Sequence, residues 1–233
     1  MNEQKHNPSA KVYFISGLGA DHRVFERISL PEGFSKRHIH WLEPGHQEPL
    51  KRYAFRLLSQ IDQTQPFWLV GLSFGGLLAS EMAQLSSPQK VILISSFANC
   101  RQIPRLYRMA GFLKLHRIIP LQLHAIASSL MNWLFGADTK EEQTLIKSFV
   151  HHTDAHFFHW ALGQCLTWQH NKTPDNLIHI HGSSDRLIPY HKVQADTLIS
   201  HGGHLMVWSH ASQINQYLAE LLQSNPTFKE KEK

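Results

Sequence analysis

The chain has 233 residues, of which 42% are hydrophobic and 18% are charged, and its formal net charge is +5. A chain of this length and hydrophobic content can bury a sizeable core, which excludes a disordered or fibrous protein. Lys and Arg exceed Asp and Glu only by 23 to 18, and no zinc-finger, helix-turn-helix or RRM pattern accompanies them, so we expect no nucleic-acid partner.

Predicted strands and helices alternate along the chain. Short β-branched and apolar runs predict six strands, at Lys11–Ser16, Arg37–Trp41, Phe67–Leu72, Val91–Ser95, Leu177–His181 and Thr197–Ser200. Amphipathic patterns with a period of 3.6 residues predict helices at 50–61, between the second and third strands, and at 214–222, after the sixth. This alternation predicts an α/β fold, with a mostly parallel six-stranded sheet and helices on both faces.

One interval interrupts the alternation, because about eighty residues, 97–176, separate the fourth strand from the fifth. Helical patterns recur within it and no Gly/Ser/Pro-rich linker flanks it. We therefore expect a helical cap at 97–176, inserted into an α/β core formed by residues 1–96 and 177–233. Within this cap, the stretch 118–137 has no formal charge and could nominally cross a bilayer, but its polar residues favour a buried or pocket-lining helix over a membrane span.

The cap also contains a basic run with no acidic residue before Asp138. Its members are Arg101, Arg105, Arg108, Lys114 and Arg117. One interpretation is a solvated helix face. The other is a positive entrance to an apolar acyl pocket, which would attract anionic substrates.

The third predicted strand leads directly into a G-x-S-x-G motif, Gly71-Leu72-Ser73-Phe74-Gly75, and an apolar helix pattern follows. This strand-turn-helix context is the one in which the motif exposes a nucleophilic serine at a sharp turn. The glycines on either side of Ser73 allow the strand and helix to approach closely. The motif therefore predicts Ser73 as a nucleophile, and the alternative is an ordinary tight turn.

A nucleophilic serine needs a base, and the base needs a carboxylate that orients it. Asp185 follows the fifth strand, where the groups at the carboxyl ends of a parallel sheet gather, whereas the loop after the fourth strand has no carboxylate. Two histidines, His201 and His204, follow the sixth strand. We expect His204 to be the base, because His201 lies at the strand end and His204 lies in the loop.

The turn after the first strand, Gly17-Leu18-Gly19, is a candidate oxyanion site, with the amide of Leu18 and that of Phe74, the residue after the serine, as donors. The turn lacks the third glycine of a dinucleotide-binding motif. Asp21, just beyond it, is expected to cap a helix that starts near Arg23.

From Lys11 to Leu222 the chain resembles small, capped proteins of the α/β-hydrolase fold. The resemblance implies Ser73 as nucleophile, Asp185 and His204 as its triad partners, and Leu18 and Phe74 as oxyanion amides. Ser16 departs from many relatives, which have histidine before the first glycine, and this changes what braces the oxyanion loop. Relatives that open epoxides or remove halogens have aspartate at the position of Ser73, so the resemblance disfavours those reactions.

These features predict a cofactor-independent serine hydrolase that cleaves a small-molecule carboxylic ester or thioester. The same triad also serves lyases of the menaquinone-pathway kind, acyl transferases and small-molecule receptors. Cys100 and Cys165 are too few for a disulfide framework and the amino terminus has no signal-peptide core, so a cytoplasmic protein is expected. His152 and His156 could share a metal on one helix face, but no third ligand is identifiable, so we expect no metal site.

Overall fold

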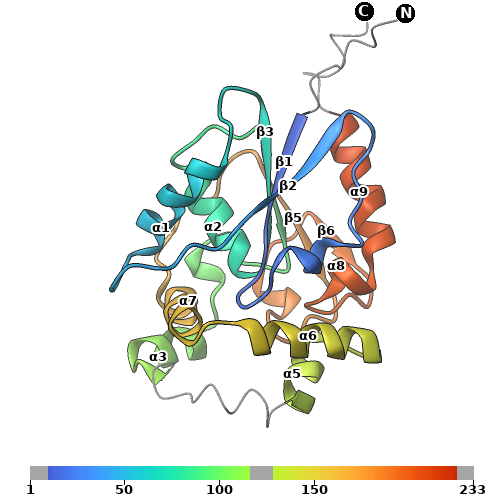
Figure 1. Ribbon diagram of the computed structural model, residues 1–233. Helices are drawn as coiled ribbons and strands as arrows, with labels where there is room; N and C mark the ends of the chain where they lie inside the picture. Colours follow the sequence, from blue (N-terminus) through green and yellow to red (C-terminus); the bar gives the residue numbers. More distant parts are fainter. Residues whose placement is uncertain (1–9, 116–127, 225–233) are drawn as a thin grey trace, which may run out of the picture.

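The computed structural model describes residues 10–115 and 128–224 and contains a six-stranded parallel sheet in the order β2-β1-β3-β4-β5-β6 (Figure 1). The strands are β1 Ala10–Ile15, β2 Phe34–Ile39, β3 Phe67–Leu72, β4 Lys90–Ile94, β5 Leu177–Gly182 and β6 Thr197–Ile199. All six predicted strands are present. The largest difference concerns β2, which begins and ends earlier than the predicted 37–41. It is an edge strand with several half-exposed residues, so its hydrophobic pattern is weak.

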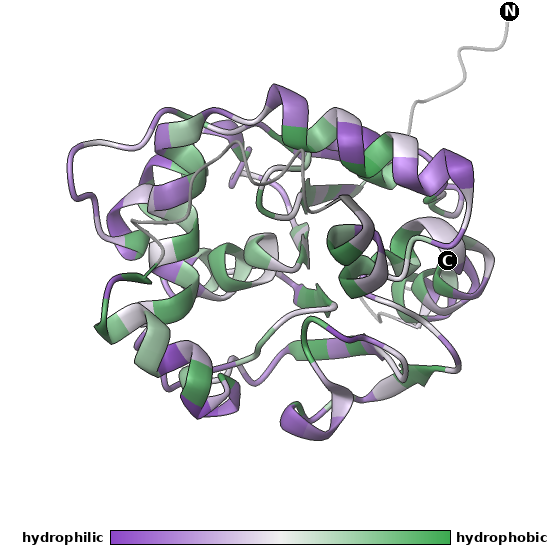
Figure 2. Cartoon of the chain, turned by 90° about the horizontal axis from the view of Figure 1, so that it is seen from below, coloured by the Kyte–Doolittle hydropathy of each residue, from purple (hydrophilic) through white to green (hydrophobic). Residues whose placement is uncertain are grey.

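Helices cover both faces of the sheet, as Figure 2 shows from the side of the strands' carboxyl ends. On one face, α1 (Leu50–Leu57) and α2 (Phe74–Ala83) pack against β1, β3 and β4. On the other face, α9 (Ala211–Gln223) and the short α8 (Met206–Ser209) pack over Val12, Trp68 and Ile92. The central strands are buried on both faces, which explains why they read as continuous apolar runs.

The interval between β4 and β5, here called the insert (residues 97–176), contains α3 (Arg105–Phe112), α5 (Ser128–Phe135), α6 (Lys140–His152) and α7 (Ala155–Thr167). Figure 1 shows these helices gathered at the carboxyl ends of the strands. A capping box between Thr139 and Glu142 starts α6, and Asp154 caps α7. His152 and His156 therefore belong to different helices and do not stand one turn apart on a single helix.

The uncharged stretch 118–137 lies partly outside the described residues. In its described part, α5 exposes Leu130 by 56% and Trp133 by 55% of their surface, so these two side chains are not buried, and the pocket-lining alternative stays a prediction. Of the basic run, Arg101, Arg105, Arg108 and Lys114 are exposed, and Arg117 lies outside the described residues. Among the helices described, none is long and apolar enough to cross a membrane.

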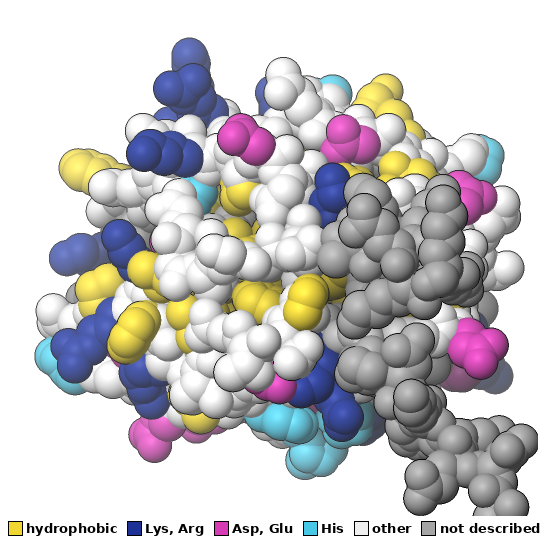
Figure 3. Space-filling view, turned by 90° about the horizontal axis from the view of Figure 1, so that it is seen from above, with side chains coloured by type: hydrophobic (Ala, Val, Ile, Leu, Met, Phe, Trp, Pro, Cys, Tyr) yellow, Lys and Arg dark blue, Asp and Glu magenta, His cyan; other side chains and the backbone are white. Residues whose placement is uncertain are grey.

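The opposite face of the molecule, at the amino ends of the strands, is shown in Figure 3. Two surface hollows lie near this end of the sheet. One, of about 560 Å³, lies between the end of α2 and residues 172–175, and the other, of about 480 Å³, lies along β1 and β2. Neither is lined by Ser73, Asp185 or His204, so these hollows are separate from the site described next.

Candidate active site

Ser73 occupies a sharp turn between β3 and α2. Its backbone has φ 52° and ψ −118°, a strained conformation for a residue with a side chain. The turn is held because the Ser73 amide donates to the Ile94 carbonyl at 3.0 Å and Ser96 Oγ donates to the Ser73 carbonyl at 2.7 Å. The surrounding core therefore fixes the serine side chain at the carboxyl end of the sheet.

The two motif glycines are required by close backbone packing. A Cβ at Gly71 would lie 2.4 Å from the Gly75 carbonyl oxygen, and a Cβ at Gly75 would lie 2.2 Å from the Ile15 carbonyl oxygen. Both distances are far inside van der Waals contact, and both contacts are with backbone. The prediction that these positions must be small is confirmed.

Ser73, His204 and Asp185 form one continuous chain of hydrogen bonds. His204 Nε2 lies 2.9 Å from Ser73 Oγ, and His204 Nδ1 lies 2.9 Å from Asp185 Oδ2. His204 and Asp185 are buried and Ser73 is half-buried. His201 is exposed in the turn after β6, where its amide bonds Ser183 Oγ, so of the two candidate histidines only His204 contacts Ser73.

The carboxylate of Asp185 is held at both oxygens. Oδ1 accepts hydrogen bonds from the amides of Leu187 at 3.0 Å and Ile188 at 2.8 Å, and Oδ2 accepts from His204. Burial acts to raise the pKa of Asp185, but the neighbouring His204, the Ile188 amide and His181 outweigh it and hold the pKa below its ordinary value. The carboxylate is therefore ionised at neutral pH, and its Oδ2 faces the His204 ring.

A second pair of histidines lies behind this carboxylate. His181 Nε2 is 2.8 Å from the Ile188 carbonyl oxygen and 3.6 Å from Asp185 Oδ2, and its Nδ1 is 3.2 Å from His179 Nε2. A carbonyl can only accept, so Nε2 of His181 carries the proton. Burial lowers the pKa of His181 and lowers that of His179 to about 3, so both rings are neutral at pH 7. This pair was not predicted from the sequence; the signal that could have found it is the alternation His179-Ile180-His181 on the strand that leads to Asp185.

The turn after β1 lies beside the serine. A Cβ on Gly17 would be 3.4 Å from the Cβ of Ser73. The turn is closed by a hydrogen bond from the Ala20 amide to the Gly17 carbonyl, and Gly19 has φ +76°, as the third position of a type II turn requires. Leu18 is the second residue of this turn. Asp21 caps the following short helix, as expected, although that helix is 3-10 rather than α.

Phe74, the other candidate amide donor, is the first residue of α2, and the amides of a first helical turn have no partner within the helix. Its ring belongs to an aromatic cluster below the turn. Trp41 lies 5.8 Å from the Phe74 ring and 5.1 Å from the Phe157 ring, and Trp160 lies 5.9 Å from Phe74, all between ring centroids. The cluster joins the core to α7 of the insert.

Helices of the insert also contact the loops that hold Asp185 and His204. Tyr107 Oη in α3 donates to the Leu187 carbonyl at 3.0 Å, and Arg186 donates to the Trp133 carbonyl in α5 at 2.7 Å. At the end of α5, the edge-on ring of Phe135 lies 5.2 Å from that of His204. These contacts cannot be found by motif, because they join segments that no sequence pattern links.

The sequence matches the Alpha/beta hydrolase family over residues 12–216. Similar solved structures include an esterase from Thermogutta terrifontis (16% identity, TM-score 0.67), a hydrolase from Oleispira antarctica (13%, 0.69) and a lipase-esterase related protein from Clostridium acetobutylicum ATCC 824 (15%, 0.65). The matches cover 92%, 94% and 91% of this chain and 89%, 93% and 95% of those chains, respectively. A comparison with curated proteins finds no match. The expected α/β-hydrolase fold is confirmed.

Proposed function

Because the chain belongs to the alpha/beta hydrolase family, we propose that it is a serine hydrolase that cleaves a small-molecule carboxylic ester or thioester through an acyl-enzyme. The observation that carries the proposal is the hydrogen-bonded chain from Ser73 Oγ through His204 to Asp185, with 2.9 Å at each step. A serine that is hydrogen-bonded to a histidine in this way can pass its proton to the histidine as it attacks. A serine in an ordinary tight turn has no such base.

In the first half of the reaction, Ser73 Oγ attacks the substrate carbonyl carbon while its proton passes to His204 Nε2. The electron pair of the carbonyl π bond moves to oxygen, and the amides of Leu18 and Phe74 stabilise this oxyanion. The Asp185 carboxylate, which remains ionised, stabilises the imidazolium. Collapse of the intermediate breaks the bond to the alcohol or thiol, which takes the proton from His204, and leaves the acyl group on Ser73.

In the second half, His204 takes a proton from water, and the hydroxide attacks the acyl carbon. Collapse returns the proton to Ser73 and releases a carboxylic acid. Every proton and electron pair in this sequence is handled by Ser73, His204, Asp185 and two backbone amides, so we propose a reaction that requires no cofactor. The insert, residues 97–176, serves as a cap whose helices bound the substrate site.

The test combines active-site labelling with a substrate panel. A fluorophosphonate probe is expected to label the wild-type protein and Ser59→Ala, an exposed serine in the 3-10 helix after α1, but not Ser73→Ala. Turnover of p-nitrophenyl esters and acyl-CoA thioesters of different lengths is expected to fall by about 10⁴ to 10⁶-fold in Ser73→Ala, because triad members act as a unit. Retention of a tenth of the activity would refute the role of Ser73.

The panel also separates the alternatives. If Ser73 is labelled but no ester or thioester is turned over, the proposal of a hydrolase is wrong, and a receptor with a vestigial triad is favoured. If esters are consumed only when an acceptor alcohol is present, the protein is an acyl transferase.

A further inference from the structure

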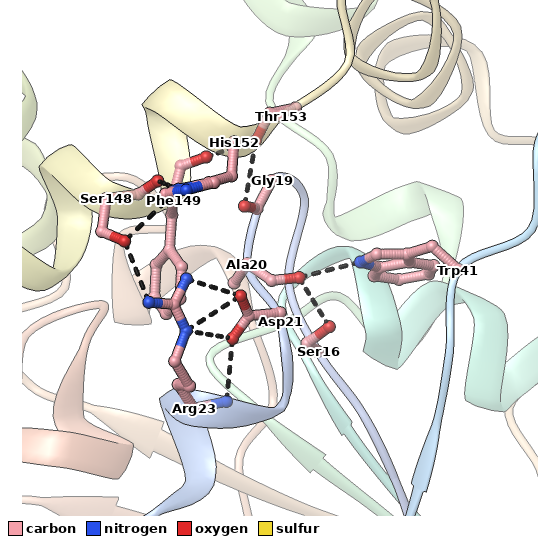
Figure 4. Close-up of polar contacts among 10 residues, drawn as sticks. All are labelled: Ser16, Gly19, Ala20, Asp21, Arg23, Trp41, Ser148, Phe149, His152 and Thr153. Carbon is pink, nitrogen blue, oxygen red and sulfur yellow. Dashed lines mark hydrogen bonds and ion pairs between the residues drawn. The ribbon is translucent and has the colours of Figure 1, made fainter.

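The turn at residues 17–20, here called the oxyanion turn, is contacted by side chains of three separate segments, whose hydrogen bonds to its carbonyls are drawn in Figure 4. Ser16 Oγ, at the end of β1, and Trp41 Nε1, after β2, both donate to the Ala20 carbonyl at 2.8 Å. Ser16 stands where many relatives have histidine, and this pair of hydrogen bonds shows what braces the loop in this chain. Both contacts come from the α/β core.

The third contact comes from the insert. Thr153 follows the last residue of α6, and its Oγ1 lies 3.0 Å from the Gly19 carbonyl oxygen and 2.6 Å from that of Phe149. The hydroxyl has one proton, which these two carbonyls share. The approach is close, since a Cβ on Gly19 would come within 2.9 Å of Thr153 Oγ1. Thr153 thus packs directly against the turn.

A charged side chain also joins α6 to the segment that follows the oxyanion turn. Arg23, just after the turn, donates to both carboxylate oxygens of Asp21 and to Ser148 Oγ in α6 at 3.0 Å. Its guanidinium also lies over the ring of Phe149, 5.3 Å from the centroid. The register between α6 and the loop is therefore fixed independently of Thr153, so the loss of the Thr153 hydroxyl alone leaves the two segments packed together.

We propose that Thr153 is a positioning residue that holds the oxyanion turn in its productive conformation, an inference that rests on the proposed hydrolase function. Glycine adopts positive and negative φ with similar ease, so the turn does not fix Gly19 by itself. The Thr153 hydroxyl holds the Gly19 carbonyl outward, toward α6. This keeps the peptide units of the turn in the orientation that leaves the Leu18 amide free to donate to an oxyanion at Ser73.

A positioning role of this kind acts on the transition state. The oxyanion exists only after Ser73 has attacked, so a misaligned Leu18 amide weakens transition-state binding and leaves ground-state binding unchanged. Loss of a whole oxyanion donor costs about 10² to 10³-fold in kcat, and a loosened donor costs less, about tenfold.

The experiment compares Thr153→Val, which keeps the shape and removes the hydroxyl, with Thr153→Ser, which restores the hydroxyl. We expect kcat to fall about tenfold in Thr153→Val, KM to stay within twofold, and Thr153→Ser to recover wild-type kcat. Thr144→Val is the matched control, because Thr144 Oγ1 makes the same kind of bond to a carbonyl four residues earlier in α6, 2.7 Å from the Lys140 oxygen, without touching the turn. It is expected to keep wild-type kcat.

A trifluoromethyl ketone provides a second readout, because it forms a tetrahedral adduct in which the Ser73 Oγ–carbon bond creates an oxyanion. Its inhibition constant is expected to rise in Thr153→Val by the same factor as kcat falls. Should Thr153→Val not fold, Thr153→Ala is measured in the same way. A change confined to KM or to melting temperature, or equal losses in the Val and Ser variants, would overturn the inference. Absence of wild-type turnover would instead refute the proposed function.

Discussion

The close backbone approach at Gly75 makes Gly75→Ala a stringent test of how the serine turn is built. The added Cβ would lie 2.2 Å from the Ile15 carbonyl oxygen and 2.4 Å from that of Ser16, whereas ordinary contacts begin at 3.4 Å. Both oxygens belong to the backbone at the end of β1, so no side-chain rotation can relieve the overlap. Either α2 or the end of β1 must move by about 1 Å to restore an ordinary contact distance.

The size of the effect follows from this overlap. Overpacking against fixed groups destabilises a fold by about 1 to 3 kcal/mol, and the double backbone clash at Gly75 places this variant at the upper end, about 3 kcal/mol. For a domain of this size that corresponds to a melting temperature about 6 to 12 °C lower. A displacement of about 1 Å in the reacting groups is expected to lower kcat about 100-fold.

Gly33→Ala supplies the control. Gly33 also has a positive φ, +86°, but no atom lies within 4 Å of its added Cβ. Its expected cost is therefore the conformational one alone, about 1 kcal/mol, with kcat unchanged. Urea unfolding of both variants measures the loss of stability, and ester turnover measures the loss of kcat. If Gly75→Ala is no less stable than Gly33→Ala and keeps wild-type kcat, the turn does not depend on this close packing.

Three further predictions concern the acid, the buried histidines and the basic run. Asp185→Asn keeps an acceptor for the amides that hold the loop but loses the negative charge, so kcat is expected to fall about 10⁴-fold in a folded protein, and a loss of less than tenfold would contradict the triad. Burial lowers the pKa of His179 from 6.5 to about 3. Between pH 6.5 and about 3, this residue therefore binds a proton in the unfolded chain but not in the folded one. Through this residue, the free energy of unfolding decreases by about 1.4 kcal/mol for each unit by which the pH is lowered. His179→Gln should reduce that slope in urea unfolding between pH 4 and 6, and an unchanged slope would mean that His179 is readily protonated in the fold. Replacing Arg101, Arg105 and Arg108 by Gln should lower kcat/KM for an anionic ester, but not for a neutral one of equal length, and the difference should shrink in high salt. Equal effects on both esters would assign these arginines to a solvated face.

The fold could be predicted from the sequence because its signals are local. The buried strands β3 and β4 are apolar runs in the sequence, and the helices α1 and α9 show an amphipathic period, so element type and order could be predicted directly. The hydrophobic pattern misplaced the bounds of the edge strand β2, because several of its residues are only partly buried. Leu130 and Trp133, which the sequence placed in a buried or pocket-lining helix, are exposed in the structure, so hydrophobicity alone did not decide between these two alternatives.

The candidate triad could be predicted for a different reason. In a parallel sheet the strand ends converge at one edge, so residues after β3, β5 and β6 were expected to meet although 131 positions separate Ser73 from His204. The structure places them within hydrogen-bond distance, and their catalytic roles remain our proposal. Neighbours such as His181 and Tyr107 were missed, because their importance depends on which carbonyl each one faces.

Several of the contacts that the sequence could not predict join the insert to the loops of the candidate site. A cap that served only to shape the substrate pocket would need to contact substrate and the pocket rim alone. Here Tyr107 reaches the loop of Asp185, the Phe135 carbonyl accepts from the Leu205 amide beside His204 at 3.0 Å, and Thr153 reaches the oxyanion turn. In the described part of the chain, three of the four loops that hold the proposed machinery, all except the Ser73 turn, thus form a hydrogen bond with the insert. Substitutions in the insert should consequently alter kcat as well as substrate preference, because these three loops take part of their hydrogen bonding from the insert.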